Sequence, residues 1–335
     1  MQHPPALSRK LVFAVAAAVL SFTLCFAAGE LLTRLCWKEK PSLEPDEKTL
    51  SYRYDPELGW FPKPNSSGRF FGSREFSFQH NRDGFRDVEH GPKVKPRIAF
   101  VGDSYVWGYD ADAHERFTDK LQERVPDWEV VNLGISGYGT DQELLLAQKW
   151  LPVYRPDVVV LVFSDNDTLE NTLNFRGGYY KPWFENSEDR LVLRGTPVPK
   201  CLRHYTVQHP FLFKSQLCQL LVQQFIKRRA PIHTSQSNPT LALILQFKAY
   251  SEAQGAKFIL SFGDEFSGER KRSFAEKTKT PYFFLIDEPH LTTDYFYPTQ
   301  GNHWTLKGQN LACDRLYEFL TTNQFLNLPP EKSSR

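Results

Sequence analysis

The length and charge of the chain set the first limits on its function. With 335 residues it can bury a full hydrophobic core, either as one large domain or as two small ones. Its 41 lysines and arginines nearly balance its 39 aspartates and glutamates, so the net charge is only +2 and the basic surface typical of nucleic-acid-binding proteins is absent. We therefore expect no nucleic-acid partner.

The first predicted element is a membrane segment at the N-terminus. Residues 11–29 form an uncharged apolar run, close to the ~20 residues that span a bilayer. Arg9 and Lys10 precede the run and favour a cytoplasmic N-terminus. A cleaved signal peptide is the alternative, with small residues around Ala27 as its cleavage site, but the run exceeds the ~7–15 residues of a usual signal core. We predict a single-pass anchor within residues 1–37, with the remaining chain in the periplasm.

A β-rich lead-in is expected between the anchor and the main domain. Residues 38–96 are rich in proline, glycine and charge, and they alternate aromatic with polar side chains in the manner of short strands and turns.

From residue 97 the pattern changes to alternating strands and helices. Apolar strands such as RIAFVG and VVVLVF are separated by predicted helices over residues 115–124 and 140–150. Such strands indicate a parallel sheet that helices cover on both faces. An insertion of mixed character interrupts the order at about 168–237, after which a helix over 240–254, two strands and a closing helix complete five strands. The predicted fold is an α/β, doubly wound, five-stranded parallel sheet over residues 97–325.

The five cysteines leave two interpretations open. Disulfides persist outside the cytoplasm, so a Cys201–Cys218 bridge is possible, but buried free thiols suit these positions equally. No cysteine and histidine spacing matches a zinc site, and we expect no metal.

Four polar or glycine positions fall where strands of the predicted sheet end or in the loops that follow. Ser104 ends the first strand, Gly137 follows the second, Asn166 follows the third, and His303 precedes the last helix. Because the carboxyl ends of parallel strands share one edge of a doubly wound sheet, these residues can meet in space.

The short motifs around these residues resemble those of the SGNH hydrolases, the GDSL-type esterase family. VGDSYVWG is similar to the serine block, NLGISGYGT to the glycine block, SDND to the asparagine block and NHW to the histidine block. The resemblance covers residues 97–320 apart from the insertion, and LGW and GFRD in the lead-in further resemble bacterial membrane-anchored members. It implies a flavodoxin-like fold and a serine esterase that needs no cofactor.

The resemblance also implies a role for each residue, and each role suits the chemistry of the side chain. Ser104 becomes a nucleophile when His303 removes its proton. The backbone N–H groups of Ser104 and Gly137 and the side-chain amide of Asn166 are suited to an oxyanion hole.

One position departs from the family pattern. An acidic residue usually stands three positions before the histidine, but this chain has Gln300 there. Gln300 is a possible orienter of His303, since its carbonyl can accept the Nδ1–H bond. An aspartate elsewhere is the alternative, and we considered Asp165, Asp167, Asp287, Asp294 and Asp314.

These features predict an extracytoplasmic esterase that hydrolyses small acyl esters, with a glycan as the expected carrier of the acyl group. Two alternatives remain open at this stage. The same acyl-enzyme could pass its acyl group to a polysaccharide hydroxyl, as in an O-acyltransferase, and an aromatic cleft built by the insertion would favour that reaction. A catalytically inactive module that binds a glycan is the other alternative, with Gln300 as its support.

Overall fold

The computed structural model describes residues 9–38, 51–187, 190–298 and 302–327. The chain divides into two compact units, which are described separately. The helical unit consists of residues 1–44 and 200–231, and the sheet unit consists of residues 45–199 and 232–335.

The sheet unit is built on five parallel strands in the spatial order β13-β12-β7-β5-β6. Numbered along the chain, this is the order 2-1-3-4-5 of flavodoxin-like folds, so the predicted fold class is confirmed. All side chains of β5 and β7 are buried, as expected of strands covered on both faces. The strands are β5 (Arg97–Gly102), β6 (Glu129–Asn132), β7 (Val158–Phe163), β12 (Lys257–Phe262) and β13 (Tyr282–Phe284).

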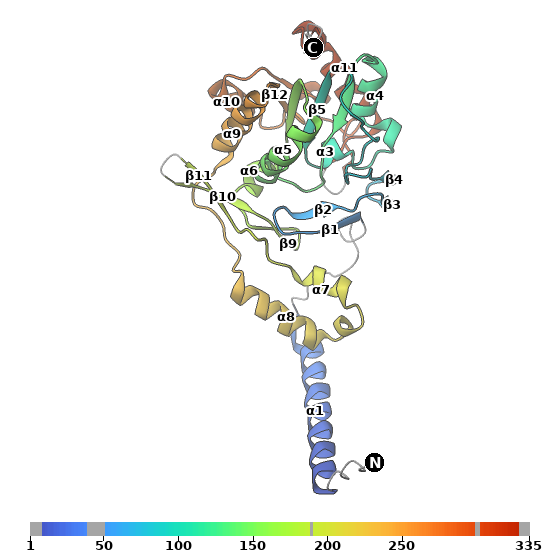
Figure 1. Ribbon diagram of the computed structural model, residues 1–335, viewed down its shortest axis with the longest axis vertical. Coiled ribbons are helices and arrows are strands. Elements are labelled where there is room, and N and C mark those ends of the chain that lie inside the picture. Colours follow the sequence, from blue (N-terminus) through green and yellow to red (C-terminus); the bar gives the residue numbers. More distant parts are fainter. Residues whose placement is uncertain (1–8, 39–50, 188–189, 299–301, 328–335) are drawn as a thin grey trace, which may run out of the picture. The chain divides into compact units, whose positions relative to one another are not determined.

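Helices flank both sides of this sheet (Figure 1). Alternate residues of β5 and β7, such as Phe100 and Val160, pack against Phe117 of α4 and Leu316 of α11. The other two large helices, α5 and α9, pack on each other and contact β5 and β12. The helices are α3 (Ser104–Trp107), α4 (Phe117–Arg124), α5 (Thr140–Tyr154), α9 (Thr240–Ala253), α10 (Gly268–Thr278) and α11 (Leu306–Thr322), with short 3-10 turns η1 (Ala113–Glu115) and η3 (Glu288–His290).

The lead-in forms two antiparallel hairpins, as the sequence predicts. The first pairs β1 (Tyr52–Asp55) with β2 (Gly59–Pro62), and the second pairs β3 (Ser67–Phe71) with β4 (Glu75–Gln79). Phe76 and Phe78 of β4 form a buried cluster with Trp107 and Tyr109, which lie at the end of α3 and in the loop after it. The lead-in therefore packs directly on the segment that follows Ser104.

Arg86 fastens this segment in place. Its side chain is only 2% exposed, and its guanidinium donates hydrogen bonds to the carbonyls of Trp107, Gly108, Ala111 and Ser77 at 3.1, 2.5, 2.5 and 2.6 Å. The same group lies over the Trp107 ring, 4.8 Å from its centroid. One buried cation thus satisfies carbonyls at the end of α3 and in the loop after it, and joins them to β4.

The predicted insertion divides between the two units. Its first part adds α6 (Asp167–Glu170) and the hairpins β8–β9 and β10–β11 to the sheet unit. Residues 200–231 belong to the helical unit. The four short strands are β8 (Phe175–Arg176), β9 (Tyr179–Tyr180), β10 (Trp183–Ser187) and β11 (Arg190–Arg194).

The helical unit contains α1 (Arg9–Cys36), α7 (Leu202–Gln208), the turn η2 (Leu212–Lys214) and α8 (Gln216–Arg229). By length and composition α1 can cross a membrane, in agreement with the apolar run in the sequence. Both Cys201 and Cys218 carry free thiols, so the bridge considered above is not formed.

Replacing Arg86 with methionine should destabilise the protein strongly. The variant Arg86→Met keeps the length of the side chain but leaves buried carbonyls without donors, so we expect a loss on the order of 3 kcal/mol in the free energy of unfolding. Urea unfolding followed by tryptophan fluorescence measures the loss. Arg82→Met is the matched control, since Arg82 is exposed and pairs with Glu89 at the surface, and it should change stability by less than ~1 kcal/mol. Equal effects of the two variants would contradict the role given to Arg86.

Candidate active site

Ser104 is the first residue of α3, directly after β5. The Oδ1 atom of Asp103 caps the helix by accepting the backbone N–H of Tyr105 at 3.0 Å. The Ser104 Oγ atom lies 2.8 Å from Nε2 of His303, which comes from the loop before α11. The structure therefore brings together the predicted nucleophile and the predicted base, which are 199 positions apart in sequence.

The His303 ring is buried and held by aromatic contacts. It is stacked on the Tyr109 ring with 4.2 Å between centroids and an angle of 22°, and Tyr105 meets it edge-on. The Tyr105 hydroxyl donates a hydrogen bond to the backbone carbonyl of Asn302 at 3.1 Å, which links the serine helix to the histidine loop. These contacts restrict the ring to an orientation in which Nε2 faces Ser104.

Asp110 lies on the other side of the histidine. Its Oδ2 atom is 3.7 Å from Nδ1 of His303, and its side chain is fully buried. The separation is within reach of an ion pair, and catalytic contacts in unliganded enzymes are often this long before substrate closes them. Ser104, His303 and Asp110 thus form a line of nucleophile, base and carboxylate.

The backbone and the lead-in hold Asp110 in this position. Its φ angle of 63° is left-handed, a conformation that aspartate tolerates better than most residues. Its Oδ1 atom accepts the backbone N–H of Ser73 at 2.7 Å. Glycine is required next to it, because a Cβ atom at Gly72 would stand 2.3 Å from that oxygen.

None of the described residues that the sequence suggested as orienters of His303 is free for that role. Gln300 lies outside the described residues, so its suggested role stays a prediction. Each of the five aspartates considered above has another partner: Asp165 pairs with Arg270, Asp167 with Thr140, Asp287 with Arg315, Asp294 with Lys307 and Asp314 with Arg124. Asp110 was missed although it ends the motif GDSYVWGYD, six positions after the serine.

Gly137 and Asn166 occupy the loops expected of oxyanion donors. Gly137 follows β6 with a φ of 78°, a conformation that glycine adopts without strain. Asn166 flanks the N-terminus of α6. Its amide nitrogen lies 3.1 Å from Oε1 of Glu170 and 3.4 Å from Oδ2 of Asp103, so the amide is engaged rather than free as the sequence suggested. The amide carries two hydrogens. The two contacts use both of them, so a ligand that accepts from this amide would replace the longer contact, to Asp103.

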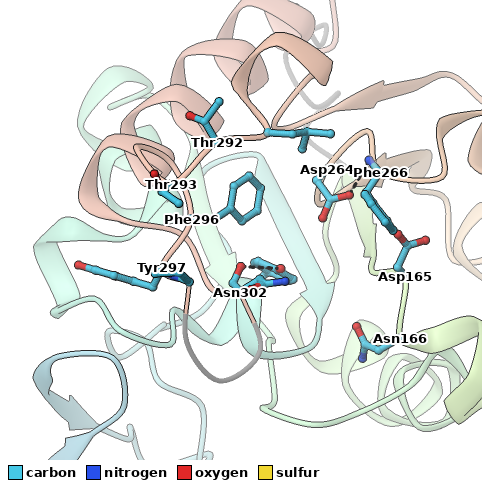
Figure 2. Close-up of a pocket in the computed structure, with 12 residues that line it drawn as sticks. Asp165, Asn166, Asp264, Phe266, Thr292, Thr293, Phe296, Tyr297 and Asn302 are labelled. Atoms are coloured by element: carbon cyan, nitrogen blue, oxygen red, sulfur yellow. Dashed lines mark hydrogen bonds between the residues drawn. The ribbon is translucent and has the colours of Figure 1, made fainter.

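A cavity of about 650 Å³, a size usual for small-molecule sites, is lined by the sequence neighbours of Ser104 and His303, although not by these two residues themselves. Figure 2 shows the Phe296 ring in the middle of the lining residues, with Asp264 and Phe266 to one side and Asn166 below them. Tyr105 and Asn302, the sequence neighbours of Ser104 and His303, complete the wall next to the catalytic pair. The wall is thus largely apolar, with two carboxylates, Asp165 and Asp264, at one side.

Several carboxyl groups are buried behind Asn166. Burial raises the pKa of Asp103 to about 7, and the nearby charge of Glu170 adds to the effect. Burial also raises the pKa of Asp167 and of Glu143 well above their usual values. Of this group, Asp141 has a buried lysine as its partner, Lys181. Burial therefore favours the protonated form of these carboxyls, which lowers the cost of removing them from water.

Comparison with known proteins gives a family match for part of the chain. The sequence model of the GDSL-like lipase/acylhydrolase family matches residues 100–204, which include the serine, glycine and asparagine motifs but not the histidine. No curated protein matches the chain.

Solved structures of three bacterial hydrolases are similar over about two thirds of the chain. The psychrotrophic esterase EstA from Pseudoalteromonas sp. is 16% identical, with a TM-score of 0.40, over 70% of this chain and 100% of that one. The acetylxylan esterase Axe2 from Geobacillus stearothermophilus is 12% identical, with a TM-score of 0.40, over 68% of this chain and 96% of that one. A GDSL-like lipase from Bacteroides thetaiotaomicron is 15% identical, with a TM-score of 0.37, over 70% and 93%.

Replacing Asp110 should slow turnover of an activated ester without weakening binding. Asp110→Asn removes the charge that stabilises a protonated His303, so we expect kcat to fall by roughly 10²–10⁴ with KM little changed. Steady-state kinetics with a p-nitrophenyl ester measures both constants. Asp112→Asn is the control, because Asp112 accepts hydrogen bonds from Ser77 two positions along the same loop. If Asp110→Asn kept its kcat within about threefold, the proposed triad would be wrong and Gln300 would become the better candidate.

The buried Asp103 should make stability depend on pH. Its folded pKa of about 7 exceeds the ordinary value of 3.8, so its contribution is complete below about pH 4 and is lost as the pH rises to 7. Asp103→Asn keeps an acceptor for Tyr105 but does not titrate. When the pH rises from 5 to 8, the wild type should lose on the order of 2 kcal/mol more of its free energy of unfolding than the variant does.

Urea unfolding at the two pH values tests this expectation. Asp112→Asn is again the control, because the pKa of Asp112 is lowered, and its contribution to stability changes only below pH 5. Parallel pH profiles for the wild type and Asp103→Asn would show that Asp103 is ionised in the folded protein throughout this range.

Proposed function

We propose that the chain is an ester-hydrolysing serine hydrolase of the GDSL-like lipase/acylhydrolase family, whose sequence model matches residues 100–204, and that Ser104, His303 and Asp110 are its catalytic triad. The observation that carries the proposal is the 2.8 Å contact between Ser104 Oγ and His303 Nε2, with a buried carboxylate facing Nδ1 of the same ring.

The geometry defines the steps of the reaction. His303 carries its proton on Nδ1, toward Asp110, and leaves Nε2 free to accept the Ser104 proton. The Ser104 oxygen attacks the ester carbonyl, and His303 then donates that proton to the departing alkoxide, which leaves as the alcohol. Water, deprotonated by His303, attacks the acyl-enzyme, releases the carboxylic acid and restores Ser104.

The negative charge of each tetrahedral intermediate needs hydrogen-bond donors. The backbone N–H groups of Ser104 and Gly137 are candidates, and so is the side-chain amide of Asn166 when its longer contact, to Asp103, is exchanged for the substrate oxygen. The contact with Glu170 would remain and hold the amide in place.

The cavity beside Ser104 supports a small acyl ester carried by a glycan as substrate. The exposed ring of Phe266 offers an apolar face against which a sugar ring can pack. Asp165 and Asp264 offer acceptors for sugar hydroxyls. The cavity is large enough for a monosaccharide unit together with a short acyl group.

Two observations argue against the alternatives that the sequence left open, acyl transfer and an inactive glycan-binding module. Acyl transfer to a polysaccharide would be favoured by an aromatic cleft built from the insertion at 168–237, but the lining of this cavity comes from other parts of the chain. An inactive module was supported by Gln300, but Asp110 supplies a carboxylate at the histidine. Hydrolysis through a complete triad is therefore the function that we propose.

We also propose that α1 is a retained anchor that holds the hydrolase domain in the periplasm. The helix is continuous from Arg9 to Cys36, and so passes through the residues at which a signal peptidase would cut. Its apolar part, residues 11–29, matches the thickness of a bilayer.

A fluorophosphonate probe tests the nucleophile directly. The wild-type protein should gain one adduct mass, and Ser104→Ala should gain none, because the probe forms a covalent bond only with an activated serine. His303→Ala should label at least about a hundredfold more slowly, since it keeps the nucleophile but loses the base. Intact-mass spectrometry measures all three. Equal labelling of the wild type and Ser104→Ala would end the esterase proposal.

A further inference from the structure

The helical unit exposes a group of large apolar side chains that have no part in the proposed active site of the sheet unit. Phe211 is 86% exposed, and Leu212, Leu221 and Phe225 are each more than half exposed. Leu221 and Phe225 are four positions apart on α8 and therefore share one face of that helix. We call these four residues the apolar face.

Basic side chains accompany both aromatic rings of the apolar face. The Lys214 ammonium lies over the Phe211 ring at 5.1 Å from its centroid, and the Arg229 guanidinium lies over the Phe225 ring at 4.5 Å. Arg228 is also exposed in the last turn of α8. Aromatic side chains accompanied by lysine or arginine are typical of segments that lie at the boundary between lipid headgroups and acyl chains.

The contact between α1 and α8 sets the depth of this face. Glu30 of α1 accepts hydrogen bonds from the Ser215 hydroxyl at 2.7 Å and from the backbone N–H groups of Gln216 and Leu217 at 3.1 and 2.9 Å. The two helices also touch closely, because a Cβ atom at Gly29 would stand 3.0 Å from the Leu217 side chain. The N-terminus of α8 is therefore attached to the point where the apolar run of α1 ends.

That point coincides with the surface of a bilayer. At 1.5 Å per residue, residues 11–29 span about 28 Å, close to the ~30 Å thickness of the hydrocarbon core. When α1 spans the membrane, Glu30 and the start of α8 lie at the level of the headgroups. An apolar face at this level, edged by cations, is complementary to a membrane that carries anionic phospholipids.

We infer that residues 202–229 form an interfacial segment that lies on the outer surface of the bilayer, with the apolar face inserted among the lipids and Lys214, Arg228 and Arg229 at the phosphates. The inference rests on the proposal that α1 is a retained anchor. The segment gives the helical unit a second attachment to the membrane besides α1, and it opposes tilting of α8 away from the surface.

Photo-crosslinking of the full chain in its own membranes tests the inference. In the variant Phe225→p-benzoylphenylalanine, the new side chain remains aromatic and, on illumination, inserts into C–H bonds of whatever it touches. The matched control carries the same residue at Lys227, which is also exposed on α8 but lies about 160° around the helix. We expect phospholipid adducts at position 225, in at least about threefold higher yield than at position 227.

The outcomes separate this inference from the proposals on which it rests. A chain that resists carbonate extraction but gives no more lipid adduct at 225 than at 227 overturns the interfacial segment and leaves the anchor in place. Adducts with a protein at position 225 overturn it in favour of a protein-docking surface. If carbonate releases the chain from the membrane, both the anchor and this inference are wrong. Fluorophosphonate labelling of Ser104 remains a separate test of the triad.

The contribution of the cations is tested with vesicles of defined composition. The combined substitutions Arg228→Gln and Arg229→Gln should lower the yield of lipid adducts at position 225 in vesicles that contain phosphatidylglycerol, but not in pure phosphatidylcholine. An equal yield with and without the two arginines in the anionic vesicles overturns their assignment to the phosphates.

Discussion

The buried carboxylate of Asp110 is the constraint on which the geometry of the site depends. A charge without solvent is stable only where donors and an opposite charge surround it. The Ser73 amide supplies a donor, and the His303 imidazole supplies the opposite charge once it takes the serine proton. The Arg86 guanidinium holds the loop that contains Asp110, because it donates hydrogen bonds to the backbone carbonyls of Gly108 and Ala111. The lead-in is therefore part of the proposed active site, because its second hairpin provides the Ser73 amide and the segment after that hairpin provides the Arg86 guanidinium.

The sequence predicted the sheet and the meeting of Ser104 with His303, because both follow from local pattern and from the rule that parallel strands end at one edge. Asp110 was not predictable in the same way. Its role depends on a left-handed backbone and on the approach of Gly72 from a hairpin that is distant in sequence, and neither leaves a periodic signal. The α10 and α8 helices were missed for a related reason, since few of their side chains are buried and both lie outside the regular alternation of apolar strands and helices. The engagement of Asn166 with Glu170 also required coordinates, as it joins the two ends of the short helix α6.

The carboxyl groups behind Asn166 show how the sheet unit accommodates acidic residues in its interior. Asp141 pairs with the buried Lys181 and Glu170 pairs with Arg176, while burial raises the pKa of Asp103, Asp167 and Glu143 and so favours their protonated forms. Asn166 contacts this group through Asp103 and Glu170. The orientation of its amide, which we propose as an oxyanion donor, is therefore linked to the protonation of the group.

The contacts of the helical unit support the proposal that α1 is retained. Cleavage after Ala27 would leave residues 28–36 as a helix of two and a half turns, which is marginal in water. Glu30 would lie in that fragment, so α8 would lose the firm partner of its N-terminal amides. Its apolar face would also be left in water, at a cost of ~25 cal/mol for each Å² of apolar surface that the lipid no longer covers. The Glu30 contact is firm only while residues 28–36 continue a longer helix, and it therefore favours the anchor.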